Sequence, residues 1–353
     1  MRIEDIDRNL RVESSITEPD IVWFDARELP FSVFGVTYDE QQKCFVRMPQ
    51  AVADTVNEGV SHLNRNTAGG RVRFRTDSTF IGIRAVMRNC GTMAHFTLAG
   101  QSGFDLYRSV AGETAVYRGT FMPLVGMKEG FSSGRYIEGQ MAEYTINFPL
   151  YDCVENLYIA LTRGAGLEPA APYRHEKPVV YYGSSITQGG CASRPGNSYQ
   201  AILSRHLDID YINLGFSGSG RAEESMVSYL SSLDMSVFVC DYDHNAPTLA
   251  YLEKTHMPLY RAIRAAHPTL PIIMLTAPDV LFNPSEYGPR RALIYANYLQ
   301  AKAEGDENLY FIGGDELFAG EDADSCTVDG CHPNDLGFYR MACGIEPVLA
   351  KLI

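Results

Sequence analysis

Three side chains in this sequence have the types and the spacing that nucleophilic catalysis requires. Asp329 and His332 stand three residues apart near the C-terminal end, and Ser185 follows the apolar run 179–182. In such a set the carboxylate orients and charge-stabilises the imidazole, and the imidazole takes the proton of the serine hydroxyl. Because Asp-x-x-His is common by chance, the prediction depends on whether the two segments meet in space. Pro333 indicates that a helix begins after His332, which would hold the imidazole rigidly.

Two further segments have residue types that could assist the same chemistry. The run 213–220 is rich in glycine and could cradle a phosphate, but it lacks both G-x-G-x-x-G and a Walker lysine. It could instead present the backbone N–H of Gly218 to an oxyanion, or be a plain tight loop. The segment 241–245 contains two aspartates and a histidine, which favour a metal or acid/base site, or else solvated loop residues. Ser185 lies outside a G-x-S-x-G elbow, because position 187 is Thr.

The residues that must position these groups form two stretches with different patterns. Between about 20 and 163, apolar and polar residues alternate with period two, as in 71–76, 81–85 and 144–148. This alternation is typical of half-buried antiparallel strands, and only 49–63 favours a short helix. We therefore predict an all-β sandwich, of jelly-roll type, over residues 1–165. The Gly- and Pro-rich segment 166–178 is predicted to be a linker.

After the linker, strands and helices alternate. Predicted strands cover 179–182, 211–214, 237–240, 272–276 and 309–312, and predicted helices cover 198–206, 247–266, 290–304 and 334 onward. Such alternation predicts an α/β domain over 179–353, with a five-stranded parallel sheet between two helical layers. Ligands of open α/β sheets bind outside the carboxyl ends of the strands. Ser185, Gly218 and Asn245 each follow a predicted strand, so we expect them on one edge.

Charge and composition narrow the class of protein. The net charge of −13 argues against a nucleic-acid or anionic-membrane surface, and no apolar run is long enough to span a bilayer. The charged N-terminal segment 1–8 lacks the apolar core of a signal peptide, so we expect a cytoplasmic protein. The eight cysteines contain no Cys-x-x-Cys pair, which favours reduced, buried thiols over a Cys326–Cys331 bridge. Recognisable zinc-ligand spacing is absent, and we predict no metal and no cofactor.

Taken together, these blocks resemble a known family. Gly183-x-Ser185-Ile-Thr with Gly189, Asn213-x-Gly-x-Ser-Gly218, Asn245 and Asp329-x-x-His332-Pro are similar to the four blocks of the SGNH (GDSL-type) esterases and lipases. Gly103-Phe-Asp-Leu-Tyr107 resembles the Gly-x-Asp-Leu-Tyr motif of a β-sandwich domain that precedes one branch of these enzymes. The segments 189–196 and 335–338 also resemble that branch.

The resemblance implies a role for each block. Ser185 would be the nucleophile, His332 the general base and Asp329 its orienting acid. The oxyanion would be held by the N–H of Ser185, the N–H of Gly218 and the amide of Asn245. Two departures stand out: Ser184 replaces the Asp of the usual Gly-Asp-Ser, and the third block lacks Gly-x-Asn-Asp. The second departure leaves Asp243 and His244 as alternatives to Asn245.

The resemblance also implies a substrate class. Enzymes with a sandwich and an SGNH domain are similar to carbohydrate O-deacetylases, so we expect hydrolysis of a small acyl ester, acetyl first, on a sugar or oligosaccharide. An acyltransferase with the same triad and a non-catalytic carbohydrate-binding protein are the alternatives. Arg194, Tyr107 and Tyr287 are expected to contact substrate. Trp23 and Tyr117 are further candidates, and for Tyr107, Trp23 and Tyr117 core packing is the alternative. The segment 279–291 is either a rim or lid or a plain connection. The sequence gives no expectation for the oligomeric state.

Overall fold

A computed structural model describes residues 6–7, 12, 15–91, 93–110 and 114–353, so most of the N-terminal segment 1–8 lies outside the described residues. Two compact units divide the chain. The first, which we call the sandwich unit, comprises 1–45, 65–172 and 193–196. The second, which we call the α/β unit, comprises 46–64, 173–192 and 197–353. The sequence predicts two contiguous domains, whereas each unit receives a segment from the other part of the sequence.

Two antiparallel sheets form the sandwich unit. The first sheet has the strand order β1 (Ile21–Asp25), β11 (Val154–Thr162), β6 (Phe80–Met87), β9 (Gly130–Tyr136). The second has the order β12 (Leu167–Glu168), β5 (Arg71–Thr76), β10 (Ala142–Asn147), β7 (Phe104–Ser109), β8 (Val116–Phe121), with β2 (Ser32–Phe34) also on β5. A separate pair is formed by β3 (Thr37–Asp39) and β4 (Cys44–Val46). The short helix α4 (Leu98–Gln101) precedes β7.

The core of this unit comes from alternate residues of both sheets. Ile81 and Ile83 of β6 are fully buried in one cluster with Val72 and Phe74 of β5. The period-two alternation therefore does mark strands, as expected of an antiparallel sandwich. Within the predicted linker, however, β12 pairs with β5, so part of that segment extends the second sheet.

The Asp of Gly-x-Asp-Leu-Tyr anchors the segment 193–196 in the sandwich unit. Asp105 on β7 is fully buried, and its Oδ2 accepts hydrogen bonds from the Gly196 N–H at 2.8 Å and from Arg194 at 2.9 Å. Its Oδ1 accepts from the Asn147 amide at 2.8 Å. Arg194 also hydrogen-bonds the Tyr107 hydroxyl. A buried carboxylate needs such partners to offset its lost hydration.

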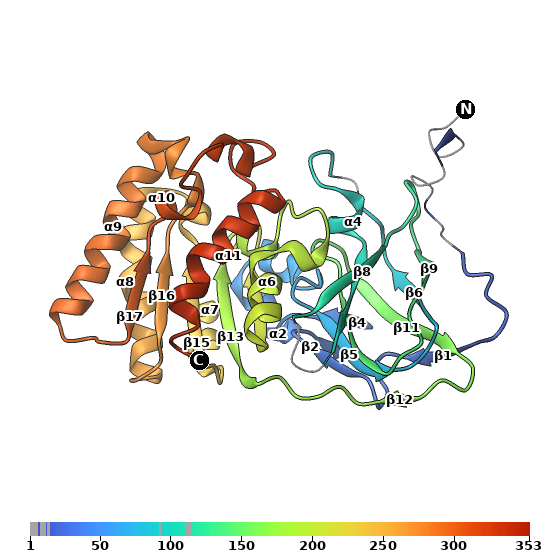
Figure 1. Ribbon diagram of the computed structural model, residues 1–353. Coiled ribbons are helices and arrows are strands. Elements are labelled where there is room, and N and C mark those ends of the chain that lie inside the picture. The colour runs from blue at the N-terminus through green and yellow to red at the C-terminus, as the bar shows by residue number, and fades with distance from the viewer. Residues whose placement is uncertain (1–5, 8–11, 13–14, 92, 111–113) are drawn as a thin grey trace. The chain divides into compact units, whose positions relative to one another are not determined.

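The α/β unit is built on a parallel sheet with the order β14 (Ile209–Gly215), β13 (His175–Gly183), β15 (Val237–Asp241), β16 (Ile272–Leu275), β17 (Leu309–Ile312). In chain order this is 2-1-3-4-5, the doubly wound arrangement of flavodoxin-like folds. Its helices are α2 (Gln50–Val56), α3 (Glu58–Leu63), α5 (Ser185–Gln188), α6 (Tyr199–Leu207), α7 (Glu224–Ser232), α8 (Leu249–Ala266), α9 (Pro284–Ala303), α10 (Gly314–Leu317) and α11 (Asp335–Leu349). Figure 1 shows α8 and α9 beside β16 and β17, and α11 near α6.

Both faces of this sheet are covered, as predicted for a three-layer domain. Val180 and Tyr182 of β13 belong to a buried cluster with residues of α2, α3, α7, α8 and α9. The neighbouring Tyr181 faces the other way, where its ring meets Tyr199 of α6, which in turn stacks on Phe338 of α11. Apolar residues on consecutive positions of β13 are explained by burial on both faces.

Some predicted helix boundaries differ from those observed. The helix predicted over 290–304 begins at Pro284, so 279–291 is a turn of 3₁₀ helix (Pro278–Leu281) followed by the first turns of α9 rather than an open loop. Gly288 and Pro289 favour a break in the pattern, but α9 continues through Pro289, which stands inside the helix. The helix α7 was not predicted. None of the helices in the described part of the chain combines the length and the apolar character needed to cross a bilayer.

We predict that Asp105→Ala lowers the free energy of unfolding by about 3–5 kcal/mol, because it leaves Arg194 and two buried N–H donors without their acceptor. Urea unfolding followed by circular dichroism measures the change. The matched control is Asp20→Ala, which breaks the exposed Asp20–Arg163 pair and should cost at most about 1 kcal/mol. Equal shifts of the two variants would contradict the anchoring role of Asp105.

Candidate active site

Ser185 is the first residue of α5, directly after β13. Ser184 caps this helix, since its hydroxyl accepts a hydrogen bond from the Ile186 N–H at 3.2 Å. Gly189 ends the helix with a φ of +106°. The short helix therefore turns back within one turn and holds Ser185 at the carboxyl end of the sheet, as the sequence predicts.

Side chains from neighbouring elements fix α5 in place. The Thr187 carbonyl accepts hydrogen bonds at 2.7 Å from the amides of Gln200 and of Asn213. At Gly215, where β14 ends, a Cβ would lie 2.2 Å from the Gln188 nitrogen. Only glycine allows this close approach, so the Asn213-x-Gly215 pair serves to seat the helix that carries Ser185.

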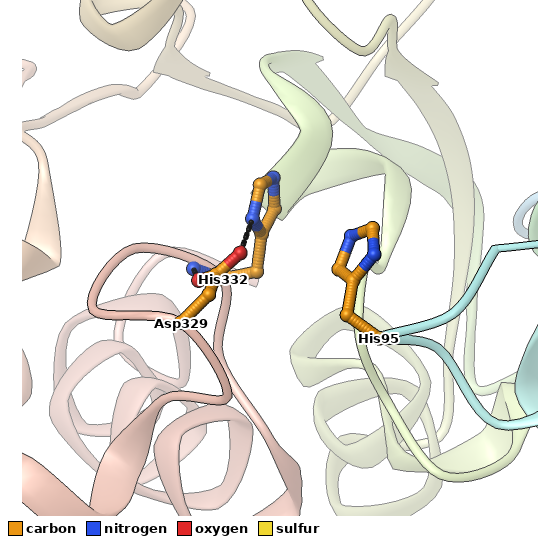
Figure 2. A group of neighbouring side chains, drawn as sticks. All are labelled: His95, Asp329 and His332. Carbon is orange, nitrogen blue, oxygen red and sulfur yellow. Dashed lines mark hydrogen bonds and ion pairs between the residues drawn. The ribbon is translucent and has the colours of Figure 1, made fainter.

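Ser185, His332 and Asp329 are in contact. Ser185 Oγ lies 3.0 Å from His332 Nε2, and His332 Nδ1 lies 2.7 Å from Asp329 Oδ2. Figure 2 shows the second contact, with the Asp329 carboxylate against the imidazole. Ser185 is buried to about nine-tenths, with a relative exposure of 9%. This chain of contacts is the arrangement in which an imidazole can take a proton from a hydroxyl while a carboxylate orients it.

Hydrogen bonds within the turn 329–332 stabilise the ionised carboxylate of Asp329. Its Oδ1 accepts hydrogen bonds from the backbone N–H of His332 at 2.7 Å and of Cys331 at 3.0 Å. Partial burial raises the pKa of Asp329, but these bonds together with the His332 side chain outweigh it and lower the pKa below its ordinary value. Asp329 therefore stays ionised, as an orienting carboxylate must.

Gly218 lies in the loop that follows β14. It is exposed, with a φ of +63°, and its carbonyl accepts from Arg221 at 2.6 Å. Its N–H donates no hydrogen bond to any other residue that the structure describes. An N–H of this kind is able to serve an oxyanion, and the assignment of Gly218 stays a prediction.

Asn245 is buried and its amide is already engaged. Nδ2 donates to the carbonyls of Phe216 and Gly220, both at 2.9 Å. An amide group has two N–H donors, and these two bonds use both. In this arrangement Asn245 fixes the loop that contains Gly218. Its direct role at the oxyanion stays a prediction and would require one of these bonds to break.

The two alternatives to Asn245 have other partners. Asp243 Oδ2 accepts from the Ala277 N–H at 2.9 Å, and His244 Nε2 lies 2.7 Å from Asp279 Oδ1. Burial lowers the pKa of His244, but hydrogen bonds with Asp279 and Cys331 and the charge of Asp243 raise it well above its ordinary value. The structure places Asp243 and His244 against these partners, and a role for either at the oxyanion stays a prediction.

The sequence analysis places Asp241, the last residue of β15, in a candidate metal or acid/base segment but gives it no role beside Ser185. It is almost fully buried, and its Oδ1 accepts hydrogen bonds from the Ser184 N–H at 3.3 Å and from the Thr187 hydroxyl. A carboxylate thus lies under the turn in which Ser184 replaces the family's Asp. Its only sequence signal is its place at a strand end beside Tyr242 and Asp243, which does not distinguish it from a loop residue.

The predicted substrate contacts are engaged within their own units. In the sandwich unit Arg194 packs over Tyr117 at 4.1 Å and over Tyr107 at 5.4 Å, and Tyr107 is buried. In the α/β unit the Tyr287 ring lies 4.7 Å from the His244 ring. Trp23 is half-buried beside Arg84. These contacts give each side chain a structural role, and a substrate role for any of them stays a prediction.

Solved structures share the fold over nearly the whole chain. A protein from Bacteroides ovatus described as a GDSL-like lipase is 30% identical, with a TM-score of 0.81, over 94% of this chain and 98% of that one. The salicylyl-acyltransferase SsfX3 of a tetracycline biosynthetic pathway is 17% identical, with a TM-score of 0.76, over 95% and 98%. A family two carbohydrate esterase from Clostridium thermocellum, solved with cellohexaose, is 14% identical, with a TM-score of 0.58, over 80% and 92%. No curated protein sequence matches the chain.

We predict a pH dependence of stability from Asp241. Burial raises its pKa to about 7 from an ordinary value of 3.8, although the Thr187 hydrogen bond opposes this. Between pH 4 and 7 the unfolded chain loses this proton and the folded chain keeps it. The free energy of unfolding therefore falls as pH rises, by at most about 1.4 kcal/mol per pH unit from this group.

Asp241→Asn should flatten this slope, measured by urea unfolding at several pH values, although the buried Asp243 will still contribute a part of it. Asp234→Asn, which changes an aspartate that is 84% exposed, should keep the slope of the unsubstituted protein. An unchanged slope in Asp241→Asn would show that Asp241 ionises normally in the folded state.

Two family profiles match the chain. A profile of the GDSL-like lipase/acylhydrolase family matches residues 176–350, and a profile of the N-terminal domain of SGNH-hydrolase-type esterases matches 21–167. The matched ranges contain both sets of motifs, and the Bacteroides ovatus relative spans both. The chain therefore belongs to the GDSL-like lipase/acylhydrolase family and is a carboxylic ester hydrolase with an N-terminal β-sandwich domain.

Proposed function

We propose that this protein hydrolyses small acyl esters, acetyl esters first, through an acyl-enzyme on Ser185. The observation that carries the proposal is the continuous set of contacts from Ser185 Oγ to His332 Nε2 at 3.0 Å and from His332 Nδ1 to Asp329 Oδ2 at 2.7 Å. It also speaks against the alternative of a non-catalytic carbohydrate-binding protein, which has no need of such contacts.

The first half-reaction forms the acyl-enzyme. With its Nδ1–H hydrogen-bonded to Asp329, His332 can accept the Ser185 hydroxyl proton on Nε2. Oγ attacks the ester carbonyl carbon and gives a tetrahedral oxyanion. The N–H groups of Ser185 and Gly218 stabilise its charge, and Asn245 holds the Gly218 loop in place. The C–O bond then breaks, and the leaving alkoxide takes the proton from Nε2.

The second half-reaction returns the enzyme. Nε2 takes a proton from water, the hydroxide oxygen attacks the acyl carbon, and a second oxyanion forms at the same position. Its collapse breaks the bond to Ser185 Oγ, which recovers its proton from Nε2 and releases the carboxylic acid. Proton transfers balance within the triad, and each oxyanion donor should contribute roughly 10²–10³-fold to turnover.

The fold relatives support an acetylated carbohydrate as the alcohol part. Besides the esterase solved with cellohexaose, an acetyl xylan esterase from Butyrivibrio proteoclasticus shares the fold, with 12% identity and a TM-score of 0.55 over 94% of this chain and 98% of that one. In the α/β unit a hollow of about 330 Å³ adjoins Asp329 and is lined by Phe282, Asp324, Thr327, Val328, Asp329 and Gly330. Its volume is at the lower end of the range for small-ligand sites, which suits a sugar-sized group rather than a long acyl chain.

The cytoplasmic location expected from the sequence stays a prediction.

A second function uses the same residues. The likeness to the salicylyl-acyltransferase extends over both units, and an acyl-enzyme transfers its acyl group to whichever hydroxyl reaches it first. The two functions differ only in the second half-reaction, where an alcohol replaces water.

We predict that Ser185→Ala lowers the turnover of p-nitrophenyl acetate by about 10⁴-fold or more, because it removes the hydroxyl that contacts His332 Nε2 and that would form the acyl-enzyme. Asp329→Asn should lower it less, since it disturbs the imidazole without removing the nucleophile. Ser228→Ala, an exposed serine on α7, is the control and should match the unsubstituted protein. Equal turnover by Ser185→Ala would overturn the proposal.

We predict that acetylated xylo- or manno-oligosaccharides release acetate in water and that adding a primary alcohol diverts little of the acetyl group. Chromatography of the products gives the ratio of acetate to new ester at increasing alcohol concentration. Preferential ester formation at alcohol concentrations far below that of water would favour the acyltransferase function instead.

A further inference from the structure

Three potential metal ligands converge in the α/β unit from segments far apart in the sequence. His244 follows β15, Asp279 lies in the 3₁₀ turn after β16, and Cys331 lies in the turn 329–332. A nitrogen of His244, a carboxylate oxygen of Asp279 and the sulfur of Cys331 all lie within 4.8 Å of one another. Nitrogen, oxygen and sulfur together are a donor set that suits zinc.

Asp279 provides an independent reason to expect a ligand here. The residue is fully buried; its Oδ1 contacts His244 Nε2 at 2.7 Å, but its Oδ2 is also buried and has no hydrogen-bond partner among the described residues. Buried polar atoms are nearly always satisfied, and a carboxylate oxygen left without a partner indicates an unpaired binding capacity. An ion pair with His244 alone satisfies only one of the two oxygens.

We propose that His244, Asp279 and Cys331 form a binding site for a zinc-like divalent transition-metal cation. In tetrahedral zinc sites the ligand atoms lie about 3.5 Å apart, so small side-chain shifts of about 1 Å bring the three atoms to that separation. The cation displaces the Cys331 thiol proton and the proton shared by His244 and Asp279, with no change of oxidation state. A water completes the fourth position on the side of Cys331, which is partly exposed.

The surroundings of the three residues fit this role. Asp243 Oδ1 forms an ion-pair contact at 3.7 Å with His244 Nδ1, the ring nitrogen that a cation on Nε2 would leave to a neighbouring carboxylate. The Tyr287 ring packs against the same imidazole at 4.7 Å and limits its rotation. These contacts would hold His244 in the orientation that a cation needs.

The site would connect to the turn 329–332. Cys331 stands between Asp329 and His332, and its N–H donates to Asp329 Oδ1 at 3.0 Å. A cation bound to Cys331 would therefore tie this turn to the segments that follow β15 and β16. The proposal does not depend on the esterase reaction, because binding and thermal stability can be measured without a substrate.

The experiment titrates the full-length, reduced, metal-free protein with Co²⁺ and follows absorption. One equivalent of Co²⁺ should produce the near-ultraviolet band of a cobalt–thiolate bond and the intense visible bands of a tetrahedral site, and Zn²⁺ should remove both. Cys331→Ser should lose the near-ultraviolet band. The matched control is Cys343→Ser, which removes an exposed thiol of α11 and should retain both bands. A band of equal strength in Cys331→Ser, or no band in the unsubstituted protein, would overturn the proposal.

Thermal unfolding provides a second readout. Zn²⁺ at a hundredfold excess over its dissociation constant should raise the Tm of the unsubstituted protein and of Cys343→Ser by several degrees, because the cation binds the folded state. The same addition should leave the Tm of Cys331→Ser and Asp279→Asn unchanged. Circular dichroism of the variants without metal establishes that they are folded, and if Asp279→Asn is not, Cys331→Ser alone decides the result. A Zn²⁺ shift of the same size in folded Cys331→Ser would contradict the site.

Discussion

The carboxylate of Asp329 is the constraint on which the candidate active site depends. It accepts two backbone N–H bonds within its own turn and a third contact from the His332 imidazole. Because the same carboxylate holds both the backbone and the ring, the direction of Nε2 is determined by the turn. Ser185 Oγ lies 3.0 Å from Nε2, within hydrogen-bond distance. A carboxylate with its pKa lowered by these bonds keeps its charge where the imidazole needs it.

Ser185 is held in this position because hydrogen bonds connect the end of β13 and α5 with α6, β14 and the loop after β14. Asn213 and Gln200 hold the Thr187 carbonyl of α5, and the Phe216 N–H donates to the Gly183 carbonyl at 3.0 Å. Asn245, in the 3₁₀ turn that follows β15, holds the loop 216–220 through two carbonyls. The polar residues of these blocks thus act largely on main-chain groups at the ends of strands. These residues fix backbone positions, whereas the proposed proton transfers involve only the side chains of Ser185, His332 and Asp329.

A buried acidic layer lies beneath these groups. Asp241, Asp243 and Asp279 all follow or end strands of the sheet and are nearly or fully buried. Burial raises the pKa of Asp241 and Asp243, since a charged carboxylate loses its hydration there. His244 lies between two of these carboxylates. Such a concentration of buried acids is costly unless protons, hydrogen bonds or a cation neutralise it, and the proposed metal site would be one such neutralisation.

Local pattern predicted most of the elements but not all their limits. Strand β17 coincides with its prediction at 309–312, since an apolar run between polar residues has one simple interpretation. The helix α9 begins six residues early, because Pro289 and Gly288 favour a break that packing of the helix against the sheet overrides. The segment 49–63 is indeed helical, but it breaks into α2 and α3 at Asn57 and belongs to the α/β unit. Membership of a unit depends on contacts distant in sequence, which no local pattern contains.

By itself the sequence determined the class of each half and the residues Ser185, Asp329 and His332, because period-two and βαβ patterns and short motifs are local properties of the chain. Only the tertiary structure decided which groups meet. Asp105 as the anchor of 193–196 joins segments far apart in the sequence. Asp241 under the Ser184 turn, and His244 near Asp279 and Cys331, join segments at or after the ends of different strands of the parallel sheet. Parallel strands bring such ends to one edge of a sheet, whereas the sequence separates them by tens of residues. Their chemistry therefore depends on strand order, which side-chain spacing does not encode.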